Sequence, residues 1–125
     1  MSRLMLGVAT VLSSTLLVAG CSLGTGPSFT QNVQPILKKH CAECHLAQGE
    51  GAQKSGFRVD SYASIMQGTK FGPVVIVGAA DSSSLYRLIA GKVDKSIQMP
   101  HGRSAIPATE IATIEQWIDQ GAKND

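Results

Sequence analysis

Residues 29–40 combine apolar and polar positions with the period of an α-helix. The apolar side of this pattern comprises Phe29, Val33, Ile36, Leu37 and His40. Because these positions lie three or four residues apart, they predict one buried face of a helix. We expect this helix from about residue 30 to residue 39, with Thr30 or Asn32 as its cap. Pro35 then falls in the first turn, where proline is tolerated.

A second and shorter helix is expected at residues 62–67. Asp60 or Ser61 stands in front of it as a capping residue, and Gly68 follows it as a stop signal. Between the first two helices, residues 46–56 are rich in glycine and small polar residues and predict a loop. Residues 57–59 carry apolar side chains at alternate positions and predict a short extended piece.

A third helix is expected to start within the run Asp-Ser-Ser-Ser at residues 81–84, which offers several caps. Its apolar face is Leu85, Leu88 and Ile89. Gly91 ends it. Tyr86 and Arg87 are expected to be exposed surface residues of this helix. The alternative is that either side chain binds a propionate group of a cofactor.

The last helix is expected to open at Pro107, with Glu110 in its first turn and Gly121 as its stop. Its apolar stripe is Ile111, Ile114, Trp117 and Ile118. Residues 74–78 favour a strand, but the run is short and isolated, so an extended cover over the core is expected instead. About four short helices and no paired strands predict an all-α fold.

The first twenty residues have the pattern of a signal peptide rather than of a domain. Arg3 supplies a positive start, and an apolar run with small residues follows as far as Ala19. The closing residues Leu17-Val18-Ala19-Gly20-Cys21 resemble the lipobox of bacterial lipoproteins. That resemblance implies cleavage before Cys21 and acylation of its thiol. An ordinary signal peptide with a nearby cysteine is the alternative.

The domain boundaries follow from this division. We expect the signal peptide at residues 1–20, a lipidated linker at residues 21–28 and one domain at residues 29–125. The formal net charge of the whole chain is +2, and one positive charge leaves with Arg3. A chain so close to neutrality carries no basic stripe, so nucleic acid is not an expected partner. Acyl chains on Cys21 would tether the domain to a membrane without spanning it.

The sequence Cys41-Ala42-Glu43-Cys44-His45 carries the chemistry of the domain. C-x-x-C-H is the attachment sequence for a c-type haem. Two thiols that are one helical turn apart can add to the two vinyl groups of one haem, and the imidazole of His45 can take an axial position on its iron. We therefore expect one covalent haem c, held by Cys41 and Cys44.

Two other uses of a C-x-x-C pair are weaker. A structural zinc site needs two further nitrogen or sulfur ligands, and no cysteine follows Cys44. A thioredoxin-like dithiol is typical of a βαβ context, which this chain lacks. A disulfide between Cys41 and Cys44 is a further alternative. A covalent haem remains the favoured interpretation.

The second axial ligand has four candidates. Met99 lies in the loop 92–104, which Pro100 stiffens, and such a loop can cross the face opposite His45. His101 stands two residues further on and is the rival. Met66 is expected in core packing, and His40 is expected on the proximal side. Met99 is favoured, because its loop stands just ahead of the last helix and can lie across the face opposite His45.

Taken together, these residues resemble class I c-type cytochromes, and more narrowly the small planctomycete-type cytochrome c domains. The resemblance covers most of residues 29–122 and includes the haem motif, Val59-Asp60-Ser61-Tyr62, Met99-Pro100 and Trp117-Ile118-x-x-Gly121-Ala122. It implies a cytochrome c fold wrapped around haem c, axial His45 and Met99, and first and last helices that cross near Trp117. Two positions depart from it: His101 follows Met99-Pro100, and Leu46 stands where the family has glycine.

The expected function is that of a lipid-anchored monohaem cytochrome, not an enzyme, which carries single electrons between redox proteins. It would work on the periplasmic side of a bacterial envelope, with the outer membrane somewhat favoured. The donor and the acceptor are not named by the sequence. The alternative is a haem-based ligand binder or sensor whose sixth site is open or held by His101.

Overall fold

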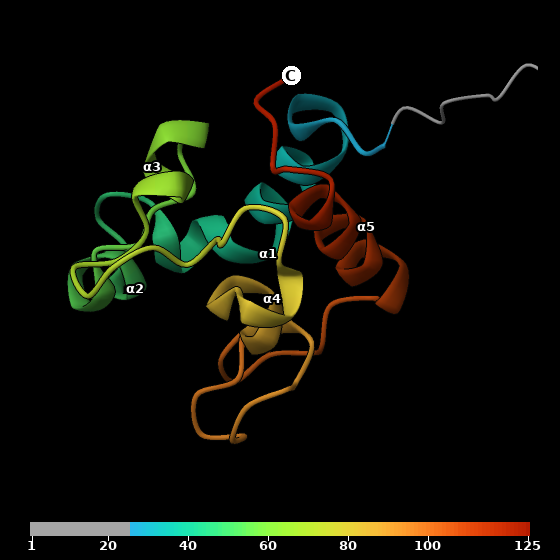
Figure 1. Cartoon of the computed structure of the whole chain (residues 1–125). Coiled ribbons are helices and arrows are strands. Elements are labelled where there is room, and N and C mark those ends of the chain that lie inside the picture. The colour runs from blue at the N-terminus through green and yellow to red at the C-terminus, as the bar shows by residue number, and fades with distance from the viewer. Residues whose placement is uncertain (1–25) are drawn as a thin grey trace, which may run out of the picture.

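The computed structural model describes residues 26–125, which fold into helices joined by long loops (Figure 1). The elements in chain order are the π-helix η1 (Phe29–Val33), α1 (Gln34–His45), α2 (Glu50–Ser55), α3 (Tyr62–Gln67), the 3-10 helix η2 (Ala80–Ser82), α4 (Ser84–Ile89) and α5 (Ala108–Asp119). Residues 26–125 contain no strand, and their only β-type pairing is an isolated bridge between Thr69 and Gly72. The predicted all-α class is confirmed. No helix in this part of the chain is long and apolar enough to cross a membrane.

The first helical segment starts earlier and runs further than the sequence predicts. Ser28 caps it, because its side-chain oxygen accepts a hydrogen bond from the Gln31 N–H. The side chain of Asn32 in turn accepts a hydrogen bond from the Ser28 N–H at 2.8 Å. The expectation of a cap at Thr30 or Asn32 is therefore wrong. After η1, α1 continues through the whole haem motif to His45, with Pro35 in its first turn.

A helix occupies part of the stretch that was predicted to be a loop. α2 is one and a half turns long, and it is stabilised at its surface by an ion pair of 2.5 Å between Glu50 and Lys54. This neighbour lowers the pKa of the Glu50 carboxyl. Ala52 is the buried residue of this helix. Gly56 ends the helix with a backbone in the left-handed region, at φ 80°. The glycines that suggest a loop are here used for close packing.

The other predicted elements are found close to their expected positions. Ser61 caps α3 by accepting from the Ser64 N–H, and Gly68 ends it. Residues 57–59 lie outside any helix or strand, as expected, but the extended run expected at residues 74–78 is interrupted by a bend at residue 74 and a turn at residues 77–78. The prediction that Tyr86 is exposed is wrong. Its side chain is buried, and its hydroxyl donates to Glu115 on α5 at 2.7 Å. Arg87 is exposed, as predicted.

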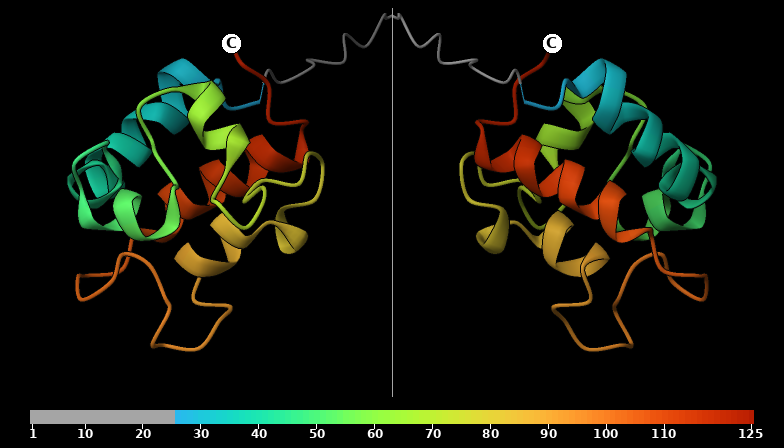
Figure 2. Two further views of the ribbon diagram at one scale, coloured as in Figure 1. Left: turned by 90° about the vertical axis from the view of Figure 1, so that its left-hand side faces the viewer. Right: turned by 90° about the vertical axis from the view of Figure 1, so that its right-hand side faces the viewer.

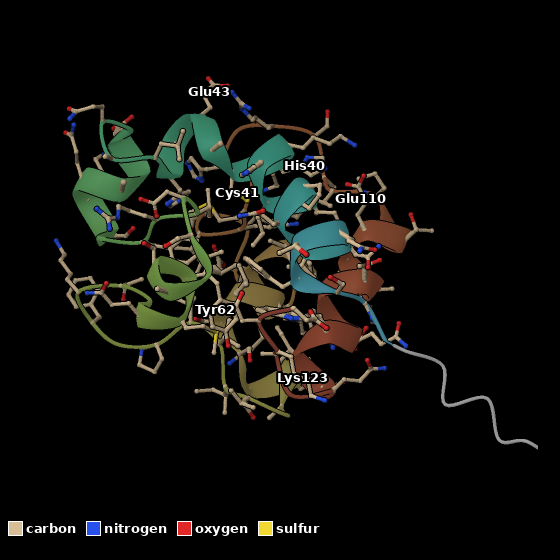
Figure 3. The ribbon with its side chains drawn as sticks, turned by 90° about the horizontal axis from the view of Figure 1, so that it is seen from above. His40, Cys41, Glu43, Tyr62, Glu110 and Lys123 are labelled. Carbon is tan, nitrogen blue, oxygen red and sulfur yellow. The ribbon has the colours of Figure 1, made fainter. Side chains whose placement is uncertain are left out.

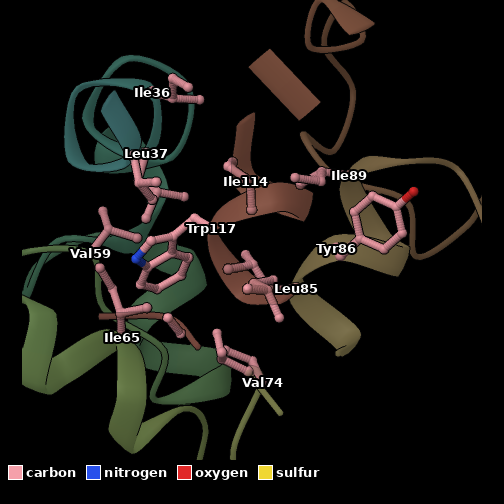
Figure 4. Close-up of a cluster of buried hydrophobic side chains, with 14 of the residues drawn as sticks. Ile36, Leu37, Val59, Ile65, Val74, Leu85, Tyr86, Ile89, Ile114 and Trp117 are labelled. Carbon is pink, nitrogen blue, oxygen red and sulfur yellow. The ribbon is translucent and has the colours of Figure 1, made fainter. Parts of the chain in front are cut away.

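The core lies between α5 and the elements around it. Its largest fully buried side chains include Trp117, Phe29, Leu37, Ile65, Ile114, Ile118, Val33 and Val59. Figure 4 shows Trp117 among Leu37, Val59 and Leu85, which come from three other segments of the chain. The Trp117 Nε1–H donates to the Lys123 carbonyl at 2.9 Å, so this buried donor is satisfied.

The two ends of the domain close against each other. The Phe29 and Trp117 rings lie 5.6 Å apart, which joins η1 to α5. The Thr30 N–H donates to the Asp125 carbonyl at 2.9 Å, and the Phe29 N–H donates to the Asp125 carboxylate at 2.8 Å. Figure 2 shows the loop 92–104 at the end of the molecule away from this closure. That loop carries Met99.

Candidate haem site

The C-terminal turn of α1 presents the three motif side chains. Cys41 is partly buried, Cys44 is exposed and His45 is intermediate. Burial, helped by the neighbouring Cys44, raises the pKa of the Cys41 thiol to about 11. This environment disfavours the thiolate that a redox dithiol would use. Haem attachment consumes both thiols as thioethers.

A cavity of about 370 Å³ opens beside this turn. Its motif side is formed by Cys41, Cys44 and His45. Its other walls are largely apolar and include Phe57, Val74, Leu85, Leu88, Ile89, Met99 and Ile106. An apolar pocket with two thiols, an imidazole and a thioether on its walls fits the requirements of a covalently bound haem. Val74, which lies at a bend, is one of these walls.

The imidazole of His45 is held by residues that follow α2. Its Nδ1 lies 3.1 Å from the Phe57 carbonyl oxygen, and that oxygen can only accept. The proton is therefore placed on Nδ1, which leaves the Nε2 lone pair available to a metal. The Phe57 ring also meets the His45 ring edge to face, at 5.2 Å between centroids. Sequence reasoning missed this role of Phe57, since only the alternation at 57–59 hinted at it.

The loop 92–104 brings Met99 to the same cavity. Met99 is partly buried and packs against the hydrophobic core. Its backbone N–H donates to the Leu88 carbonyl at 3.1 Å, which ties the loop to α4. His101 also lines the cavity, but it is exposed at the rim. The structure thus places Met99 and His45 on the walls of one cavity.

The remaining two candidates, His40 and Met66, have other contacts. His40 lines the cavity edge, but its Nε2 is 2.5 Å from a Glu110 carboxylate oxygen on α5. Figure 3 shows His40 and Glu110 facing each other across the two helices. Met66 packs against the core and is not among the cavity-lining residues.

The charged rim of the cavity was not foreseen from the sequence. Arg103 and Lys54 line it, whereas Tyr86 and Arg87 do not. Arg103 pairs with Glu43 of the haem motif, and this partner raises the pKa of the guanidinium. No spacing rule links residue 103 to residue 43, because only the folded loop brings them together.

Within residues 26–125, no group of three His, Cys, Asp or Glu side chains gathers as an ordinary metal-ion site would require. The predicted lipidation site, Cys21, lies outside the described residues, as does the predicted signal peptide. Their boundaries stay predictions.

Comparison with known families adds an independent finding. The family model for planctomycete cytochrome C matches residues 41–101. The chain carries a planctomycete-type cytochrome c domain. The matched segment begins at Cys41, passes through α2, α3 and α4, and ends just after Met99. Neither the curated proteins nor the solved structures give a match.

This result confirms the resemblance that the sequence suggested. It also supports haem and iron binding, with haem c as the cofactor that the family implies. The walls of the cavity described above are drawn mainly from the matched segment.

Proposed function

We propose that this chain is a monohaem c-type cytochrome that carries single electrons between redox proteins. The observation that carries the proposal is the shared cavity: both motif cysteines, His45 and Met99 line the same apolar space. The bound haem would supply reversible one-electron exchange at its iron. Each protein group around it then has a defined task.

Cys41 and Cys44 would hold the haem through thioether bonds, which would keep the cofactor in place during repeated electron exchange. His45 offers Nε2, and its Nδ1–H is committed to the Phe57 carbonyl. Met99 offers a soft sulfur from the opposite loop, which favours the ferrous state relative to a second imidazole. The apolar walls also disfavour the extra positive charge of the ferric state.

The proposed setting is a bacterial envelope. Acylation of Cys21 would hold the domain on the periplasmic side of a membrane, with the outer membrane somewhat favoured. Its partners would be a redox donor and a redox acceptor, with no nucleic acid involved. One haem exchanges one electron at a time, so the proposed role is that of a carrier and not of an enzyme.

Absorption spectroscopy of the purified domain, made in a host with c-haem maturation machinery, tests the proposal. We expect a sharp c-type spectrum on reduction and the weak far-red band of methionine-to-iron ligation on oxidation. The variant with both Cys41→Ala and Cys44→Ala should lose all haem during denaturing extraction, whereas the wild type should retain it. Haem that resists extraction from the double variant would overturn the covalent assignment.

A haem-based sensor is the second candidate, favoured by the position of His101 at the cavity rim. In that case the far-red band would be absent from the wild type. Carbon monoxide would also bind to the native ferrous protein. His101→Ala separates the two functions, because it leaves an electron carrier with axial Met99 unchanged and alters a sensor that uses His101.

A further inference from the structure

The segment that follows the haem motif packs against it unusually closely. A Cβ added to Gly49 would lie 2.3 Å from the Cys44 carbonyl oxygen. A Cβ added to Gly51 would lie 2.8 Å from Cε1 and 2.9 Å from Nε2 of His45. Real Cβ atoms do not approach other atoms so closely, so something would have to move. α2 can lie against His45 only because position 51 has no side chain.

Ser55 connects the two segments that hold the imidazole. Its hydroxyl donates to the Gly51 carbonyl at 2.6 Å and accepts from the Phe57 N–H at 3.1 Å. The Phe57 carbonyl in turn accepts from His45 Nδ1–H at 3.1 Å. The Val59 N–H donates to the His45 carbonyl at 2.9 Å and pins the backbone of the same residue. These contacts fix the Nδ1 side of the imidazole and the backbone of His45.

We propose that Gly51 and Ser55 are positioning residues that set the orientation of the His45 imidazole toward the haem iron. The inference rests on the proposed haem function and names two residues to which neither the motif nor the family match assigns a role. Gly51 keeps the edge of the ring that carries Nε2 free of a side chain. Ser55 holds the Phe57 carbonyl in register with α2, so the acceptor of the Nδ1 proton stays in place.

Helix stability by itself predicts the opposite preference at position 51. Glycine inside a helix is less stable than alanine, because it loses more backbone freedom on folding. Helix propensity alone would therefore make Gly51→Ala neutral or stabilising, whereas packing against the Cys44 carbonyl oxygen, 2.9 Å from the added Cβ, would make it destabilising. Stability does not report the positioning role, which is instead measured at the haem iron and at the His45 ring.

The first experiment compares the ferric holoproteins of the wild type, Gly51→Ala and Gln53→Ala. Gln53 is exposed on the same helix and serves as the matched control. We expect Gly51→Ala to show a high-spin ferric fraction that the wild type and the control lack. The hyperfine-shifted proton resonances of the His45 ring should also move. A wild-type spectrum and unshifted ring resonances in Gly51→Ala would overturn the role of Gly51.

The second experiment compares Ser55→Ala with Ser55→Thr, which keeps the hydroxyl. Losing the hydroxyl should weaken the hydrogen bond at Nδ1, make the imidazole a poorer donor to iron and raise the reduction potential. It should also speed solvent exchange of the His45 Nδ1–H. Ser55→Thr should restore both values, and equal shifts in the two variants, or none in Ser55→Ala, would overturn the role of Ser55. A wild type without haem would instead refute the proposed function itself.

Discussion

At the scale of single residues, the site depends on pairs of atoms that the sequence does not place side by side. The haem motif names Cys41, Cys44 and His45 directly, and Met99 is suggested by its loop. The partner of the His45 Nδ1 is different, because it is a backbone carbonyl that any residue at position 57 would supply. A backbone acceptor leaves no mark in the sequence, so it had to be found in the structure.

Met99→Leu tests the proposed sulfur ligand with little change of volume. We expect the far-red band to disappear and the reduction potential to fall, because the soft sulfur that favours ferrous iron is lost. Redox titration followed by absorption checks both. The swap itself should cost less than about 1.5 kcal/mol of stability.

Met66→Leu is the matched control for that experiment. Met66 packs against the core without lining the cavity. The same chemical change there should leave the band and the potential at their wild-type values. If Met66→Leu removed the band and Met99→Leu kept it, the ligand assignment would be wrong.

At the scale of elements, the sequence predicts the helices whose apolar face is long enough to show a period. α5 appears as predicted from its stripe of Ile114, Trp117 and Ile118, and α1 from Val33, Ile36 and Leu37. α2 escaped prediction because it buries only Ala52 and contains a glycine. The i, i+4 pair Glu50 and Lys54 before Gly56 was the signal that could have found it.

The cavity was only partly predictable for the same reason. Its motif wall follows from local spacing, which the sequence states directly. Its rim depends on loops that meet in space, as Arg103 and Glu43 do. Tyr86 shows a further limit, since it falls outside the apolar face of its helix and was expected to be exposed, yet it is buried and its hydroxyl donates to Glu115 on α5.

The contact between α1 and α5 should make the fold sensitive to acid. Lys39 and His40 both pair with Glu110, and these partners lower the pKa of its carboxyl. Because the pKa of Glu110 is lower in the folded state, the two pairs stabilise the fold at pH values above the ordinary pKa of 4.5. This stabilisation is lost as the pH falls through the pKa of the folded state. Glu110→Gln should therefore narrow the difference in unfolding free energy between about pH 7 and about pH 3.

Denaturant unfolding of the holoprotein at the two pH values measures this difference. Asp81→Asn is a suitable control, because Asp81 pairs with Lys92 and takes no part in the pairing between α1 and α5. A wild-type acid response in Glu110→Gln would show that the pairing between α1 and α5 does not contribute.

At the scale of the whole molecule, the closure of the chain ends stabilises one end while the cavity occupies another. Phe29 is 2% exposed and lies between Tyr62 and Trp117, at 5.2 Å and 5.6 Å from their ring centroids. Removing its ring leaves a cavity that the surrounding rings cannot fill. Phe29→Ala should therefore lower the unfolding free energy by about 3–5 kcal/mol.

Phe71→Ala makes the same change at a side chain that is 86% exposed. Its effect on stability should stay within about 0.5 kcal/mol. Both values come from denaturant titration with the absorption of the haem and the fluorescence of Trp117 as probes. Equal losses for the two variants would mean that the closure of the ends adds nothing to stability.

The same arrangement sets how a tethered domain would meet its partners. The chain enters the described fold beside Gln120 and the C-terminus, while the Met99 loop lies at the far end of the molecule (Figures 1 and 2). A membrane anchor at Cys21 would therefore leave the haem-facing loop directed away from its point of attachment.

Cys21→Ser should move the protein from the membrane fraction to the soluble fraction and leave its haem spectrum unchanged. Fractionation of cells that express the two forms, with haem absorption as the readout, checks both statements, because retained haem shows that export still occurred. Persistent membrane attachment of Cys21→Ser would exclude the lipid at that residue as the anchor, and the cytochrome itself would be unaffected by that result.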